Sequence, residues 1–269
     1  MELNKLGERT FWLPHQPEND RPMLVLLQGD RLALAVDAGA SAAHVEEFYA
    51  QLDDAGLPRP DLTAITHWHW GHTFGMHRAH GLTVACRRTG ELLAQARASL
   101  ADPAAVLALK RSEEHIAREY AEAGIVVALP DVVFDGELLL DLGGLTARVL
   151  TAASPHSDDT VLVHVPEEGL LFLGDATCGD PFDGWRVDEE RLRALMRTIE
   201  GIDCETCLLG HADPLGKGEL LGVPMPIVIY LVLIVLCIGA MLYTGGILEG
   251  ANIIDAFANC SSSTALVLG

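Results

Sequence analysis

Three histidines lie within six positions of the segment "AITHWHWGHTFGMH", residues 64–77: His67, His69 and His72. Imidazole nitrogens are among the usual protein ligands of zinc. Residues i and i+2 of an extended segment point to the same side, so His67 and His69 can bind one ion together. His72 would begin the following helix and face a second position. The spacing therefore predicts a metal site at the end of an apolar run.

Three more candidate ligands follow short apolar runs further along the chain. They are His156 in "SPHSDD", Asp175 in "LGDA" and His211 in "LGH". A lone histidine at a strand end is more often a packed core residue than a metal ligand. A cluster of three histidines, joined by three further donors that each follow a strand, favours the metal site instead.

The order of these motifs resembles that of the metallo-β-lactamase fold hydrolases. Their signature is HxHxDH, followed by a distant histidine, an aspartate in a "GD" step and a last histidine. A further motif, "VDAGAS" at residues 36–41, also matches, and the resemblance covers about residues 8 to 221. The resemblance implies an α/β fold, an αββα sandwich that holds the metals at one edge of its two sheets.

The resemblance also implies a role for each candidate residue. His67, His69 and His156 would hold the first ion, and His72 and His211 would hold the second.

Asp175 would bridge the two ions and is the candidate catalytic residue. Asp37 would support the ligands from behind, through a hydrogen bond to a histidine or to the backbone. The implied cofactor is one or two zinc ions, or another divalent metal. The implied reaction is the hydrolysis of a small-molecule ester, lactone, thioester or phosphoester by a metal-activated water.

Gly71 departs from the family pattern, because the family has an aspartate at this position of HxHxDH. That aspartate would ligate the second ion, and glycine has no side chain to replace it. One alternative is therefore a catalytically impaired binding module with the same fold. The other is a working hydrolase with a weak second site, which leaves one ion or a different metal preference unless a neighbouring group compensates. The candidates for compensation are Asp158, Asp159, Cys178 and Asp180.

The composition restricts the partners of the chain. With 18 basic and 38 acidic residues, the formal net charge is −20, which argues against nucleic acid because phosphate binding needs a Lys/Arg surface. A small-molecule substrate is the expected partner. The six cysteines do not indicate a disulfide framework in 269 residues. The first residues contain no apolar targeting segment, so we expect a cytoplasmic catalytic domain.

Short apolar runs alternate with helical periodicity over the first 211 residues. A strand pair is predicted at 22–39, and helices at 41–56, 88–123 and 188–200. Further strands are expected at 61–66, 82–86, 132–134, 137–142, 145–152, 160–166, 169–175 and 205–211. This mixture favours layered α/β packing with a site built on the loops.

The composition changes near Leu220. The 29 residues from Leu220 to Leu248 carry no charge, and a helix of roughly 20 apolar residues can cross a bilayer. We therefore predict two parts, a metallo-β-lactamase-like domain at 1–221 and an apolar membrane-type segment at 222–269, with a transmembrane helix at 226–248 that would anchor the domain. A fusion or a truncated fragment would also explain the abrupt change.

Overall fold

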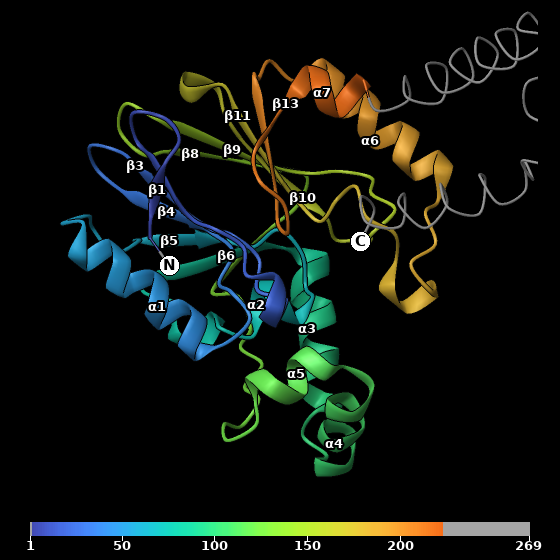
Figure 1. The fold of residues 1–269 in the computed structure, drawn as a ribbon. Helices are drawn as coiled ribbons and strands as arrows, with labels where there is room; N and C mark the ends of the chain where they lie inside the picture. The colour runs from blue at the N-terminus through green and yellow to red at the C-terminus, as the bar shows by residue number, and fades with distance from the viewer. Residues whose placement is uncertain (1, 223–269) are drawn as a thin grey trace, which may run out of the picture. The chain divides into compact units, whose positions relative to one another are not determined.

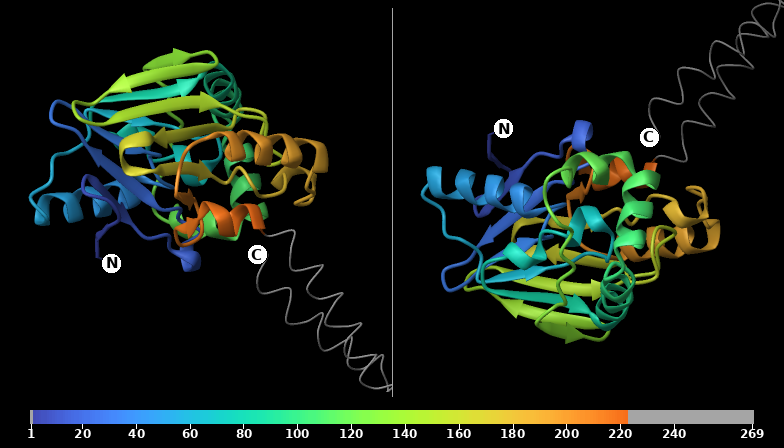
Figure 2. Two further views of the ribbon diagram at one scale, coloured as in Figure 1. Left: turned by 90° about the horizontal axis from the view of Figure 1, so that it is seen from above. Right: turned by 90° about the horizontal axis from the view of Figure 1, so that it is seen from below.

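Two β-sheets packed face to face form the centre of the computed structural model, which describes residues 2–222 (Figures 1 and 2). The first sheet has seven strands. In order across the sheet they are β1 (Asn4–Lys5), β2 (Thr10–Leu13), β3 (Leu24–Gln28), β4 (Ala33–Val36), β5 (Leu62–Ala64), β6 (Leu82–Cys86) and β7 (Val132–Phe134). Strands β1 to β4 pair antiparallel, whereas β4 to β7 pair parallel.

The second sheet has six strands. In order they are β13 (Leu215–Gly216), β12 (Thr206–Leu209), β11 (Leu170–Gly174), β10 (Val161–Val165), β9 (Thr146–Thr151) and β8 (Glu137–Asp141). Only the β11–β12 pair is parallel. Apolar side chains from both sheets, among them Val25, Val36, Val149 and Val163, form the core between them. This core fixes the distance between the two sets of strand ends.

Helices cover the outer face of each sheet (Figures 1 and 2). On the first sheet lie α1 (Ala42–Asp54), α2 (Trp70–Thr73), α3 (Arg87–Ser99) and α5 (Glu114–Glu119), while α4 (Pro103–Ser112) packs against α5 away from the strands; on the second sheet lie α6 (Glu189–Gly201) and α7 (Lys217–Gly222). Four short 3-10 helices complete the list: η1 (Pro17–Asn19), η2 (Met76–Arg78), η3 (Pro166–Glu168) and η4 (Pro181–Asp183). Phe48 of α1 packs against Leu24 and Leu26 of β3, and Leu195 of α6 packs in a cluster with Leu171 of β11.

The predicted α/β architecture is confirmed, and most elements lie where the pattern indicates. Ser41 caps α1 by accepting a hydrogen bond from the His44 amide, as the sequence suggests. The helical stretch 88–123 is divided into three helices. One break lies at Asp102-Pro103, where the sequence indicates an interruption and Asp102 caps α4, and the other lies at Glu113, which has an extended backbone and caps α5. The short strands β1, β2 and β13 and the helix α7 were not predicted.

The predicted transmembrane helix at 226–248 lies outside the described residues. Within residues 2–222, no single helix has the length and apolar composition needed to cross a membrane, although α3 and α4, bent by 109° at their junction, meet those criteria together. Residues up to Leu221 belong to one compact unit.

Candidate metal centre

The predicted ligands reach one edge of the sandwich from both sheets. Three strands of the described chain end shortly before a candidate: β11 ends directly before Asp175, β12 ends with one residue between it and His211, and β5 ends with two residues between it and His67. His72 lies in α2, and His156 lies in the loop between β9 and β10. Polar groups that follow strand ends gather at one edge of a sheet. The six candidates, which are far apart in sequence, therefore meet in space.

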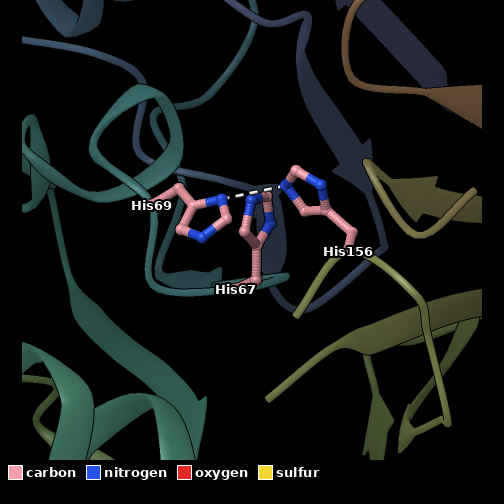
Figure 3. Close-up of side chains that lie close together, drawn as sticks. All are labelled: His67, His69 and His156. Atoms are coloured by element: carbon pink, nitrogen blue, oxygen red, sulfur yellow. Dashed lines mark hydrogen bonds between the residues drawn. The ribbon is translucent and has the colours of Figure 1, made fainter. Parts of the chain in front are cut away.

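His67, His69 and His156 form the first donor group (Figure 3). Their ligand atoms lie within 4.8 Å of one another, and His69 Nδ1 is 2.9 Å from His156 Nε2. His156 Nδ1 lies 2.8 Å from the Gly179 carbonyl oxygen, to which it can only donate, so Nε2 keeps its lone pair. The buried Nε2 of His67 has no hydrogen-bond partner. An unpartnered imidazole nitrogen that faces other donors fits a bound cation.

Asp175 joins this group to a second one, made of His67, His72 and Asp175 itself. Its Oδ2 is 3.2 Å from His72 Nε2 and 3.4 Å from His211 Nε2. The same oxygen is 3.7 Å from His156 Nε2 and 3.9 Å from His67 Nε2. One carboxylate oxygen thus faces imidazole nitrogens of both groups.

Burial sets the charge of the first group. It lowers the pKa of His69 to about 3 and lowers the pKa values of His67 and His156, which neighbouring histidines lower further. These imidazoles are therefore neutral near pH 7. Metal ligation needs neutral histidines, because a protonated nitrogen has no lone pair to give.

Around Asp175, the imidazoles of His72 and His211 lie beside an ionised carboxylate. Burial raises the pKa of Asp175, but His211 and His72 outweigh it and hold that pKa well below its usual range. Burial likewise opposes protonation of His72, and the carboxylates of Asp175 and Asp37 together raise its pKa to about 10. Without a metal, a proton on His72 thus balances these carboxylates. A divalent cation between the same groups would take over that role.

The Asp37 carboxylate contacts His72 at the ring nitrogen that does not face Asp175. Its Oδ2 lies 2.7 Å from His72 Nδ1, and its Oδ1 accepts a 2.8 Å hydrogen bond from the Thr66 amide. The backbone of Asp37 is left-handed, with φ of 63°, a conformation that aspartate tolerates better than most residues. The carboxylate therefore orients His72 and fixes the turn that delivers His67.

Two glycines beside the ligands were not singled out from the sequence. A Cβ at Gly210 would lie 2.3 Å from Asp175 Oδ1, so a side chain there would displace the carboxylate. Gly174 has φ of +52°, and its Cβ would lie 2.8 Å from Thr66 Oγ1. The signal that could have found them is the glycine that directly precedes both Asp175 and His211.

The backbone at Gly71 does not require glycine. A Cβ there would lie 3.5 Å from Pro22 Cδ and 3.7 Å from the Asp20 carbonyl oxygen, which are ordinary contacts, and Gly71 is not among the residues with positive φ. Its only structural effect is that a helix position lacks a side chain, at a cost of about 1 kcal/mol relative to alanine.

The residues suggested as compensation for Gly71 belong to neither donor group identified among residues 2–222. Asp158 pairs with Arg88, and Asp180 accepts a hydrogen bond from the Phe182 amide. Asp159 Oδ1 accepts a hydrogen bond from Ser157, whereas its buried Oδ2 has no hydrogen-bond partner. Cys178 is an exposed cysteine and belongs to neither of these groups. A carboxylate that was not predicted lies beside a candidate ligand, since Asp20 Oδ1 is 3.4 Å from His211 Nδ1.

Aromatic side chains border the first donor group. Phe182 stacks on Trp68, with ring centroids 5.4 Å apart, and lies at the same distance from His69. Trp185 lies 6.4 Å from His156. Phe182 and Trp185 are 73% and 64% exposed, which is high for rings of this size. They present an apolar surface next to the predicted metal ligands.

Comparison with known proteins identifies the family. The family model described as "Metallo-beta-lactamase superfamily" matches residues 23–211, which include all the predicted ligands. The chain therefore belongs to the metallo-β-lactamase superfamily, a superfamily that includes metal-dependent hydrolases. No curated protein matches the chain.

Solved structures share the fold at low sequence identity. A metallo-β-lactamase from Pontibacter korlensis is 17% identical, with a TM-score of 0.56 over 81% of this chain and 94% of that chain. A metallo-β-lactamase from Hirschia baltica is 18% identical, with a TM-score of 0.56 over 82% and 94%. One from Cronobacter sakazakii, with a "HARLDQ motif", is 15% identical, with a TM-score of 0.58 over 81% and 79%. Identities this low establish the fold of this chain and leave its substrate open.

Proposed function

We propose that the chain is a metal-dependent hydrolase that acts on a small-molecule ester, lactone, thioester or phosphoester. The observation that carries the proposal is the convergence of neutral, buried imidazole nitrogens on the ionised Asp175 carboxylate. This donor set is the one that hydrolytic zinc sites use. When bound there, zinc or another divalent cation would activate water and stabilise negative charge that develops on the substrate.

Each predicted site residue has its own role in this proposal. His67, His69 and His156 would hold the first ion, and His72 and His211 would hold the second.

Asp175 lies between the two groups and would act as the shared, catalytic carboxylate. Asp37 keeps His72 oriented through its 2.7 Å contact to Nδ1. Glycine at position 71 weakens the second position and leaves the first intact.

The exposed rings of Phe182 and Trp185 support an apolar or aromatic group on the substrate. Such a group would lie against these rings while its scissile bond faces Asp175. The net charge of −20 supports a partner other than nucleic acid. The proposal also includes a cytoplasmic location and a membrane anchor at 226–248. These two parts rest on the sequence alone.

The test is hydrolysis by the full chain before and after removal of metal with a chelator. The substrates are acetyl and benzoyl esters, a lactone, a thioester and a phosphoester. We expect hydrolysis of at least one class, lost on chelation and restored by zinc, with the benzoyl ester preferred to the acetyl ester. Zinc binding without hydrolysis of any of these substrates would favour the impaired binding module instead. Hydrolysis unaffected by chelation would contradict the proposal.

A further inference from the structure

A buried carboxylate close to the first donor group has no role in the proposed reaction. Asp159 is 1% exposed and lies in the loop between β9 and β10, three residues after His156. Its Oδ1 accepts a 2.5 Å hydrogen bond from the Ser157 hydroxyl, whereas Oδ2 has no hydrogen-bond partner. Burying a carboxylate with one unpaired oxygen costs free energy. Stabilisation of the fold alone therefore does not explain this residue.

The Asp159 carboxylate contacts the segment that carries two of the first group's histidines. Burial raises the pKa of Asp159, whereas contacts with Ser157, Thr89 and the Trp68 amide lower it. Trp68 lies between two of the three predicted ligands of the first ion. The contact with its amide therefore restrains the backbone from which both imidazoles project.

The beginning of α3 also holds residue 159. Cys86 Sγ donates to the Asp159 carbonyl oxygen at 3.3 Å, and Thr89 Oγ1 lies 3.2 Å from the same sulfur. Cys86 is the residue before α3, and Thr89 lies in its first turn. A carboxylate beside the N-terminus of a helix interacts favourably with the helix dipole. The β9–β10 loop of the second sheet is therefore attached to the first sheet at the end of β6.

A backbone hydrogen bond joins the same two segments. The Val161 amide donates to the Thr66 carbonyl oxygen at 2.8 Å, and Thr66 directly precedes His67. In Figure 3, His156 comes from a different segment from His67 and His69, and the three rings face one another. The distances between their nitrogens therefore depend on how the two segments are held together.

We propose that Asp159 is a positioning residue, which holds the His156 loop against the backbone of Trp68 and so sets the spacing of the first donor group. The inference rests on the proposed function, since it assumes that these histidines hold metal. Asp159 acts through Ser157 and Trp68, the sequence neighbours of the ligands. Loss of a supporting residue of this kind typically weakens metal binding by about 10- to 100-fold.

The test compares Asp159→Asn with Asp158→Asn in the full chain. Asparagine has the same shape and keeps an acceptor for Ser157, so the loop should fold. Asp158 is the matched control, because its side chain is 44% exposed and its only ion pair is with Arg88. Thr89→Val, which keeps the shape of that side chain, removes one contact of the carboxylate and serves as the second variant.

Three measurements separate positioning from a purely structural role. Competition with a chromophoric chelator gives the affinity for the first zinc ion. Cobalt(II) absorption reports the geometry of the histidine ligands without any assay of activity. Urea unfolding of the chelator-treated chain shows that each variant is folded under the conditions of the affinity measurement.

We expect Asp159→Asn to weaken the first zinc ion by about 10- to 100-fold and to change the cobalt(II) spectrum. Thr89→Val should weaken the same ion by a smaller factor. Asp158→Asn should change the affinity by no more than about twofold, because an exposed charge is screened by salt.

Two results would overturn the inference while the proposed function stands. The first is an unchanged zinc affinity and cobalt(II) spectrum in Asp159→Asn, or in Thr89→Val if Asp159→Asn does not fold. The second is an equal loss of affinity in Asp158→Asn, which would mean that the charge of the loop matters rather than the buried contact. A wild-type chain that binds no zinc would overturn both this inference and the proposed function.

Discussion

Replacing His67 with alanine should weaken the binding of both metal ions. His67 is the only histidine common to the two donor groups identified among residues 2–222. Its Nε2 is buried, has no hydrogen-bond partner and lies 3.9 Å from Asp175 Oδ2. Loss of a ligand costs more than the 10- to 100-fold in affinity that is typical for loss of a supporting residue. We therefore expect at least about a 100-fold weaker affinity for the first ion, and a weaker second ion as well.

The measurement is zinc bound per full-length chain after dialysis, with His77→Ala as the matched control. His77 is also close to the motif in sequence, but its Nδ1 contacts the Phe74 carbonyl oxygen at 3.0 Å and it belongs to neither donor group. The control should keep the wild-type metal content. Full metal content in His67→Ala would show that the cation lies elsewhere.

Replacing Asp37 with alanine should destabilise the metal-free chain by about 3 kcal/mol or more. The carboxylate accepts hydrogen bonds from the Thr66 amide and hydroxyl and faces His72 Nδ1, all of them buried. Each buried group left unpaired costs about 1–3 kcal/mol, and the effects are not additive. Alanine also tolerates the left-handed backbone at φ 63° less well than aspartate does.

Denaturant unfolding of the chelator-treated chain measures this loss. Asp131→Ala is the matched control, because Asp131 makes the same pair of hydrogen bonds to Thr83 in a more exposed place. It should cost only about 1 kcal/mol. The loss in free energy of unfolding for Asp37→Asn should lie between those for Asp37→Ala and Asp131→Ala. Asparagine keeps an acceptor for Thr66 but loses the charge that faces His72. Equal losses for Asp37→Ala and Asp131→Ala would contradict the supporting role of Asp37.

The local sequence pattern predicted those elements of the fold that depend on residues close together in the sequence. The hairpin of β3 and β4, the Ser41 cap and the strands before His67, Asp175 and His211 all follow from short apolar runs and the polar residues that end them. The donor cluster was predictable because polar residues at strand ends gather at one edge of a layered fold.

Contacts between distant segments were not predictable in this way. The approach of Asp20 to His211 depends on the hydrogen bond from Met23 to Gly210, between segments far apart in the sequence. Gly210 in turn matters only because the Asp175 carboxylate lies against its backbone. The strand β1 has two residues, and its pairing with β2 depends on tertiary packing rather than on its own pattern.

Elemental analysis of the purified full-length chain tests most directly whether these histidines and Asp175 form a metal centre. After zinc is added and the excess removed, we expect two zinc ions per chain, with the second more weakly held. A zinc content no greater than that of the His67→Ala variant would contradict this expectation.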